Sequence, residues 1–191
     1  GAGFSGASAV HMNIFGLNPV VVFGSEPQKQ RFLRALFVGR ERACFAVTEP
    51  NTGLNTRKIK TKAEKKGDAY VVSGQKVWIS TAQVAEKVLL LAQASAGLTL
   101  FYTDLDRKYV EVREIDKMGR HAVDSNQVFF DALPVPEEDR IGEEGKGFEY
   151  ILHGMNPERI LIGAECVGLG RCALARAAKY ARERIVFDRP I

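Results

Sequence analysis

Three short stretches of the sequence place polar side chains within apolar surroundings, where they could support chemistry. The first, FAVTEPNTG at residues 45–53, is an apolar run that ends in a hydroxyl, a carboxylate and a glycine turn. A strand that ends in this way offers backbone N–H groups and the Thr48 hydroxyl to a planar or anionic ligand. Many strands end similarly only in order to turn, so taken alone this stretch favours a structural role.

The second stretch, GQKVWISTA at residues 74–82, contains Trp78, which is the only tryptophan of the chain. A single tryptophan in a strand usually belongs to a hydrophobic core. An indole followed by the hydroxyls of Ser80 and Thr81 is also suited to flank a flat cofactor. Both interpretations stay open from these residues.

The third stretch, MNPERILIG at residues 155–163, interrupts an apolar helical pattern with Glu158 and Arg159. A carboxylate among apolar neighbours is partly desolvated, which raises its pKa toward that of a useful general base. The alternative is an exposed glutamate in the first turn of a helix, where the helix dipole favours a negative charge.

The elements that must position these stretches follow the order helix, strand block, helix. Ser25 and Gln28 form the S-x-x-Q pattern of a capping box, which predicts a helix that ends near Gly39. Residues 43–147 alternate short apolar runs with turn residues, including a hairpin around Gly67, and predict a small β-sandwich or barrel. Helical periodicity returns at residue 148, and Pro157 should kink that helix or begin a new one capped by Asn156.

The composition of the 191 residues narrows the class of protein. Apolar residues make up 46% and charged residues 26%, as in ordinary globular proteins. The 27 basic and 23 acidic residues are scattered, and the basic stretch at residues 58–66 lacks the interleaved aromatics of a nucleic-acid site. No apolar run is long enough for a membrane span. The three cysteines fit neither a disulfide framework nor a metal site, so we expect buried free thiols.

Taken together, the three stretches resemble the signatures of one family, the flavin-dependent acyl-CoA dehydrogenases. FAVTEPNTG is similar to the first signature, GQKVWIS to the Gly-x-Lys-x-Trp-Ile-Thr/Ser strand, and ERILIGAECVGLGRCALARAAKYARERIVFDRPI to the first helix of the C-terminal domain. EPQKQRFL, KMG and FFDALPVPEEDRIGEEGKGF also match in the same order. The resemblance therefore covers nearly the whole chain.

The resemblance implies an α+β fold in which helical segments flank a central β domain. Residues 1–42 would end an N-terminal helical domain, residues 43–147 would form the β domain, and residues 148–191 would begin a C-terminal helical bundle. The sequence would then be a piece of a longer chain. Such proteins are commonly homo-oligomers, dimers or tetramers, that act in fatty-acid β-oxidation, in the cytoplasm of bacteria or otherwise in the mitochondrial matrix.

The resemblance also assigns roles to individual residues. It implies FAD as cofactor, contacted by Phe45, Ala46, Val47, Thr48, Gly53, Leu54, Trp78, Ile79, Ser80 and Arg184, the last at the pyrophosphate. It places Leu54, Asn156 and Arg159 near an acyl-CoA substrate. Glu158 would be the catalytic base, as in the isovaleryl and long-chain members, whereas most members carry that carboxylate further downstream, beyond Ile191 here.

The expected reaction is the α,β-dehydrogenation of an acyl-CoA to a trans-2-enoyl-CoA, with electrons passed to an electron-transfer flavoprotein. One alternative is an acyl-CoA oxidase or related flavin enzyme of the same fold. Another is a non-catalytic binding or assembly module that has lost the flavin. Two departures from the family pattern support the non-catalytic module: Leu54 replaces a serine, and the connection at residues 93–98 is short. Asp188 also stands where glycine is common.

Overall fold

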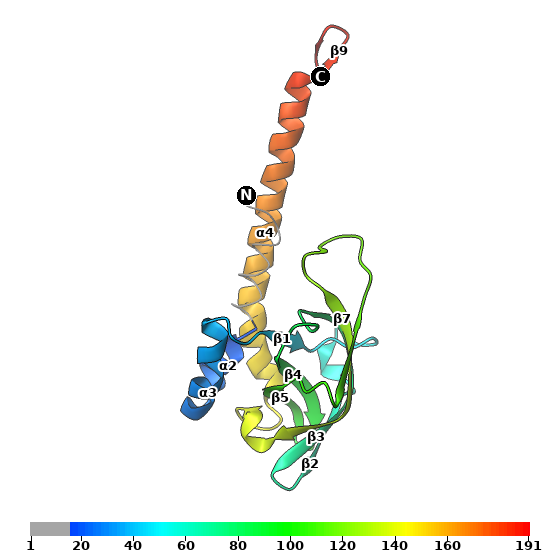
Figure 1. Ribbon diagram of the computed structural model, residues 1–191. Helices are drawn as coiled ribbons and strands as arrows, with labels where there is room; N and C mark the ends of the chain where they lie inside the picture. The colour runs from blue at the N-terminus through cyan, green and yellow to red at the C-terminus, as the bar shows by residue number, and fades with distance from the viewer. Residues whose placement is uncertain (1–15) are drawn as a thin grey trace.

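The computed structural model describes residues 16–191, so the part of the predicted N-terminal helical segment at residues 1–15 lies outside the described residues. A long helix rises from a compact assembly of strands and two short helices (Figure 1). The elements are α2 (Asn18–Phe23), α3 (Glu26–Phe37), β1 (Ala43–Ala46), η1 (Thr56–Lys58), β2 (Lys62–Lys66), β3 (Ala69–Ser80), β4 (Lys87–Ala94), β5 (Gly97–Asp104), β6 (Val110–Glu114), β7 (Ser125–Pro136), η2 (Glu137–Asp139), β8 (Arg140–Ile141), α4 (Gly147–Glu183), β9 (Ile185–Val186) and β10 (Arg189–Pro190).

The helix predicted from the capping box is confirmed as α3. Ser25 Oγ accepts from the backbone N–H of Gln28, and the Gln28 side chain accepts from the backbone N–H of Ser25. The Gln28 amide also donates to the carbonyls of Glu138 and Arg140, which ties α3 to β8. One side chain therefore both starts the helix and docks it on the sheet.

The strands form one open sheet in the order β6-β7-β3-β2-β4-β5-β8, with β1 parallel to β4. The predicted hairpin around Gly67 is confirmed as β2 and β3. One half of the sheet, β6-β7-β3-β2, is joined to the other half, β4-β5-β8, by a single parallel pair, Lys62 with Gln93. The predicted α+β fold is confirmed, but of the predicted sandwich or barrel a closed barrel does not form, because β6 and β8 lie at the two ends of the sheet and do not pair with each other.

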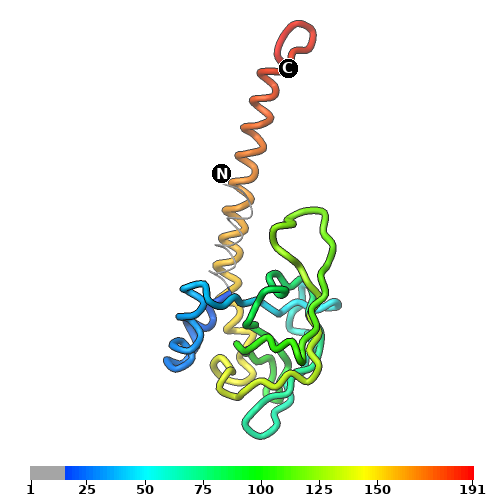
Figure 2. The backbone as a smooth tube through the Cα atoms, viewed as in Figure 1, coloured from blue at the N-terminus to red at the C-terminus, as the bar shows by residue number. Residues whose placement is uncertain are grey.

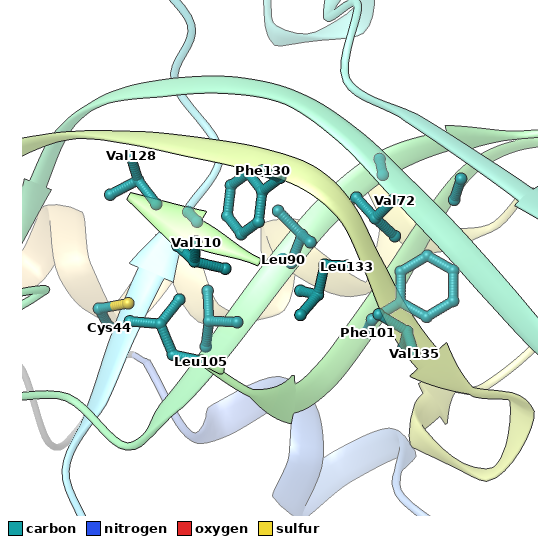
Figure 3. Close-up of a cluster of buried hydrophobic side chains, with 14 of the residues drawn as sticks. Cys44, Val72, Leu90, Phe101, Leu105, Val110, Val128, Phe130, Leu133 and Val135 are labelled. Atoms are coloured by element: carbon teal, nitrogen blue, oxygen red, sulfur yellow. The ribbon is translucent and has the colours of Figure 1, made fainter. Parts of the chain in front are cut away.

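The sheet curls around a hydrophobic core that takes side chains from both of its halves. Figure 3 shows Val72, Phe130 and Leu133 of β3 and β7 facing Leu90 and Phe101 of β4 and β5. A second cluster lies on the other face of β4 and β5, where Leu89, Leu91 and Leu100 pack against α2, α3 and the base of α4. Strand β4 is therefore buried on both faces, which explains its nearly uninterrupted apolar sequence.

The short connection between β4 and β5 is a two-residue turn, with Ala94 paired to Gly97. The Glu144 carboxylate accepts from Ser95 Oγ and from the backbone N–H of Ala96. These hydrogen bonds hold the pKa of Glu144 at about 2. The segment that leads into α4 is thereby fixed to the tip of this hairpin.

Helix α4 runs without interruption from Gly147 to Glu183. The predictions that Pro157 begins a new helix and that Asn156 caps it are therefore wrong. Proline removes one backbone donor, which leaves the His153 carbonyl without its usual partner, but the helix continues through this point. Only the base of α4 is buried, at Gly147, Tyr150, Ile151 and Gly154.

Cys44 is buried in the core, but Cys166 and Cys172 lie exposed on α4, so the prediction of three buried thiols is wrong for two of them. Between residues 16 and 191, no helix is both long and apolar enough to cross a bilayer. The same residues hold no group of three or more histidine, cysteine, aspartate or glutamate side chains placed to bind a metal.

Gly147, where α4 meets the sheet, is expected to be intolerant of a side chain. A Cβ at this position would lie 2.6 Å from backbone atoms of Thr99 and Leu100. We expect Gly147→Ala to lower the free energy of unfolding by about 1–3 kcal/mol, the usual effect of overpacking. Chemical denaturation would measure this change.

Gly163→Ala is the matched control, because, apart from its chain neighbours and the adjoining backbone of α4, no described atom lies within 4 Å of a Cβ at Gly163. Alanine favours a helix over glycine by about 1 kcal/mol, so this variant should be as stable as the parent or more so. Equal stability of the two variants would contradict the close approach of α4 to β5.

Candidate functional site

The segment that follows β1 forms the first wall of the candidate site. Strand β1 ends at Ala46, and the chain then turns at Pro50 with a hydrogen bond from the Thr52 N–H to the Glu49 carbonyl. Phe45 and Thr48 are half-buried, whereas Gly53 and Leu54 are exposed at the rim. The strand thus carries the Thr48 hydroxyl from the core to an open edge.

The second wall is a bulge in β3. The register between β3 and β7 shifts between Lys76 and Ile79, and Trp78 adopts a φ of 62°. A positive φ is an outlier for so large a residue, and bulges of this kind re-aim side chains next to functional sites. The Trp78 side chain is 60% exposed instead of joining the core. The Val77 N–H donates to the Thr48 carbonyl at 2.9 Å, which joins the two walls.

A buried ion pair lies behind both walls. Lys76 is fully buried, and its Nζ lies 3.1 Å from Glu49 Oε1 and donates to the Val47 carbonyl at 2.9 Å. The Glu49 carboxylate also accepts from the N–H groups of Lys60 and Thr61 and from the Thr61 hydroxyl. The pair therefore fixes the backbone on either side of Thr48 to β3.

The surroundings of this pair shift both of its pKa values downward. Burial lowers the pKa of Lys76 to about 8, against the opposing attraction of Glu49. Burial would raise the pKa of Glu49, but the Thr61 hydrogen bond and the charge of Lys76 outweigh it and leave that pKa below its usual value. We infer that the pair is ionised at neutral pH and forms part of the framework of the site.

The third wall is one face of α4 near its base. Phe148, Leu152, Met155 and Ile162 lie along this face, together with Glu158 and Arg159. Glu158 is half-buried, and Arg159 Nη1 donates to Asn156 Oδ1 at 2.7 Å. A carboxylate and a guanidinium thus border the opening formed with the other two walls.

The three walls enclose a pocket of about 520 Å³. This volume is typical of small-molecule sites. Ten residues named from the sequence line it: Phe45, Val47, Thr48, Gly53, Leu54, Trp78, Ile79, Ser80, Glu158 and Arg159. The roles given to them stay predictions, but the structure places them around one cavity.

Three other predicted site residues do not line the pocket. The Ala46 side chain belongs to the core of the sheet, and Asn156 is exposed and accepts a hydrogen bond from the pocket residue Arg159. Arg184 is exposed beyond the far end of α4, next to the small β9–β10 hairpin (Figure 1). A role for Arg184 at this pocket would need a site that includes another chain.

Sequence reasoning missed several residues that line the pocket. Four of them share one face of α4 at steps of four, three and seven residues: Phe148, Leu152, Met155 and Ile162. This helical spacing can be recognised in the sequence if the helix is taken to begin at residue 147. Arg120 comes from the loop between β6 and β7, and no periodic pattern marks it.

Trp78→Gly should separate the function of Trp78 from its contribution to stability. Glycine adopts a positive φ without strain, and the indole is mostly exposed, so we expect the free energy of unfolding to stay within about 1 kcal/mol of the parent. Loss of the aromatic wall should at the same time weaken binding of any flat cofactor. Thermal denaturation and a ligand titration, side by side, would measure the two effects. A large loss of stability with unchanged ligand binding would show that Trp78 is a core residue.

Comparison with known proteins identifies the family. A model of the acyl-CoA dehydrogenase middle domain matches residues 44–133, and one of the acyl-CoA dehydrogenase C-terminal domain matches residues 145–191. The mitochondrial isovaleryl-CoA dehydrogenase of Oryza sativa subsp. japonica is 33% identical over 187 residues, which are 95% of this chain and 46% of that protein.

Solved structures agree with the sequence matches. Butyryl-CoA dehydrogenase from Megasphaera elsdenii superposes with a TM-score of 0.89 at 30% identity, over 96% of this chain and 51% of that one. The prolyl acyl carrier protein oxidase AnaB has a TM-score of 0.89 at 30% identity, over 98% of this chain and 52% of that one.

The chain spans about half the length of the relatives it matches. Within that span, the two family models cover most of the residues, and the relatives agree with the chain in both sequence and fold. The chain therefore belongs to the acyl-CoA dehydrogenase family.

Proposed function

We propose that this chain contributes the flavin and substrate pocket of an FAD-dependent enzyme that dehydrogenates an acyl-CoA thioester to a trans-2-enoyl-CoA. The observation that carries the proposal is the meeting of Thr48, Trp78 and Glu158, from three separate elements, around one pocket. The isovaleryl-CoA and butyryl-CoA dehydrogenases among the relatives support the reaction class.

The residues of the pocket fit an isoalloxazine ring. Trp78 offers a flat, exposed aromatic wall, and its strained bulge holds the indole in that position. The hydroxyls of Thr48 and Ser80 border the same space and can hydrogen-bond the polar edge of a flavin. When bound, FAD supplies the redox chemistry by accepting a hydride from the β-carbon of the substrate.

Glu158 would remove the proton from the α-carbon. The carboxylate borders the pocket beside the apolar side chains of Leu152, Met155 and Ile162, which suit an acyl chain. The α-proton passes to the carboxylate and the hydride leaves the β-carbon, so the two carbons are left joined by a double bond. Charge that develops on the thioester oxygen requires positioned donors, and Arg159 lies next to the base.

The complete protein would be a homo-oligomer that passes electrons to an electron-transfer flavoprotein. Ile160, Val167, Leu169 and Leu174 are exposed along α4, and apolar surface of this extent usually marks an interface. Arg184 could reach the FAD pyrophosphate only across such an interface. These assignments follow from the family and are part of the proposal.

The decisive experiment is a flavin spectrum of the purified holoprotein before and after anaerobic addition of a series of acyl-CoA thioesters. The proposal requires an oxidised flavin spectrum that bleaches with at least one thioester. A colourless protein that takes up no added FAD would support a non-catalytic module instead.

An oxidase of the same fold is the second candidate, favoured by the similarity to the AnaB oxidase. The two candidates differ in how the reduced flavin is reoxidised. Oxygen consumption at the rate of thioester turnover, without any added acceptor, would favour the oxidase. Slow reoxidation by oxygen and fast reoxidation by an electron-transfer flavoprotein would favour the dehydrogenase.

A further inference from the structure

A buried lysine lies behind the wall of the pocket, and the proposed reaction does not use it. Lys76 is fully buried in β3, two residues before Trp78. Burying an ammonium group carries a large desolvation cost, and well-packed apolar side chains in place of a buried ion pair often leave a protein equally stable. Stability alone therefore does not account for a charge at this position.

Lys76 contacts the lining of the pocket through one peptide group. Its Nζ donates to the Val47 carbonyl at 2.9 Å, and both Val47 and Thr48 line the pocket. In a planar trans peptide, the carbonyl and the N–H point in opposite directions. Because the Val47 carbonyl faces the buried ammonium, the N–H of Thr48 faces away from it, toward the side on which the pocket lies.

The Thr48 N–H is a donor that the fold itself does not use. Among residues 16–191, no backbone or side-chain group accepts a hydrogen bond from it. Its neighbours in the same segment are engaged, since the Thr48 carbonyl accepts from Val77 and the Thr52 N–H donates to the Glu49 carbonyl. The Thr48 N–H is therefore available to an acceptor atom on a ligand in the pocket.

The charge of Lys76 strengthens this donor. A hydrogen bond from a charged group polarises the peptide that accepts it, and the N–H of that peptide then becomes a better donor. Glu49 is the charged group that faces Lys76, with Oε1 3.1 Å from Nζ. Val128, opposite Lys76 on β7, and Thr61, which donates to the same carboxylate, carry no charge. The ammonium thus both orients the Val47–Thr48 peptide and polarises it.

We propose that Lys76 is a positioning residue for the flavin, which acts through the Val47–Thr48 peptide to hold the Thr48 N–H as a polarised donor to the polar edge of the isoalloxazine ring. The inference rests on the proposed function and adds to it a buried charge that tunes the cofactor. Reduced flavin carries more negative charge on its polar edge than oxidised flavin, so a polarised donor favours the reduced form.

A charge-neutral double substitution tests the proposal. Lys76→Met/Glu49→Gln removes one positive and one negative charge, so the net charge of the site is kept and no buried charge is left unpaired. Titration of the complete apoprotein with FAD gives the affinity for oxidised flavin, and the midpoint potential of the bound flavin gives the affinity for reduced relative to oxidised flavin. We expect a loss of about 3- to 10-fold for oxidised FAD and a further loss of similar size for reduced FAD, seen as a lower midpoint potential.

The parent protein provides a second test that needs no substitution. Burial lowers the pKa of Lys76 to about 8, whereas the pKa of Glu49 is below its usual value, so only the lysine of this pair changes charge near pH 8. The ammonium is present below its pKa and is lost as the pH rises. The affinity for oxidised FAD should therefore fall as the pH is raised from 7 to 9.5, and the double variant should lack this fall.

Asp139→Asn is the matched control for a loss of stability. Asp139 is another buried carboxylate, which accepts from Thr103 Oγ1 at 2.6 Å and pairs with Arg31 away from the pocket. This variant should be less stable than the parent but should keep its FAD affinity and midpoint potential.

Two results would show that Lys76 has a structural role only and would overturn the inference. One is a double variant that loses affinity equally for oxidised and reduced FAD, or for neither. The other, which decides the matter if the double variant does not fold, is an FAD affinity of the parent that stays constant across this pH range. Either result in a parent that binds FAD and is reduced by an acyl-CoA would overturn this inference alone, whereas a parent that takes up no FAD would overturn the proposed function as well.

Discussion

Glu158→Gln is expected to slow flavin reduction by acyl-CoA by about 10²- to 10⁴-fold, the usual contribution of a positioned general base. Glutamine keeps the shape of the side chain but cannot take up the α-proton. Because the side chain is half-buried at the pocket and outside both hydrophobic cores, its loss should not affect folding. Anaerobic stopped-flow absorbance at the flavin band would measure the rate, with FAD content matched between the variants.

Glu149→Gln is the appropriate control, because Glu149 lies in the first turn of the same helix and is exposed outside the pocket. Its rate should equal that of the parent. Normal reduction in Glu158→Gln would remove Glu158 from the mechanism and would place the base on a carboxylate outside this chain.

Lys76→Met is expected to lower the free energy of unfolding by about 3–5 kcal/mol, the typical result of breaking one side of a buried ion pair. Methionine fills much of the lysine's volume, but it leaves the Glu49 charge without its cation and the Val47 carbonyl without its donor. Equilibrium denaturation with urea would measure the loss.

Lys65→Met provides the comparison, since Lys65 pairs with Glu137 at 2.7 Å while both side chains are substantially exposed. Exposed pairs contribute about 0–1 kcal/mol. The double variant Lys76→Met/Glu49→Gln should recover part of the loss, because no buried charge remains unpaired. Equal stability of Lys76→Met and Lys65→Met would contradict the assigned role of the buried pair.

The same pair should affect the pH dependence of stability at both extremes. The pKa of Glu49 is lowered in the folded chain, so its contribution is present above the ordinary carboxyl pKa and is lost as the pH falls through the folded value. The pKa of Lys76 is lowered from 10.5 to about 8, so between these values the unfolded chain binds more protons and stability rises with pH. Lys76→Met should remove the rise of the free energy of unfolding between pH 8 and 10.5. Glu49→Gln should remove the loss of that free energy at acidic pH. Slopes identical to those of the parent would contradict the assigned shifts.

Local rules predicted the parts of the fold that depend on neighbouring residues. The capping box at Ser25 started a helix, and the turn at Gly67 closed a hairpin. The capping box and the hairpin turn are local patterns and can therefore be read from the sequence. The three motif stretches also line one pocket, but the resemblance to the family implied this, since the residues of each stretch taken alone left a structural role open.

Features that depend on distant contacts were not predictable. Whether the sheet closes is decided by its terminal strands and by one pair, Lys62 with Gln93, and no local pattern specifies them. Pro157 lacks one helical donor, but the turns on either side of it are intact and the helix continues. Arg120 lines the pocket from the loop between β6 and β7, which extends from the sheet in the same direction as α4 (Figure 2), and the sequence around Arg120 does not reveal this.

The most direct test of the central claim is a crystal structure of the holoprotein with FAD and a 3-thiaacyl-CoA. We predict that Trp78 and the Thr48 hydroxyl contact the isoalloxazine ring, and that a carboxylate oxygen of Glu158 lies about 3–3.5 Å from the α-carbon, the separation of groups poised to react. A flavin bound elsewhere, or a Glu158 carboxylate pointing into solvent while another carboxylate faces the α-carbon, would contradict the account.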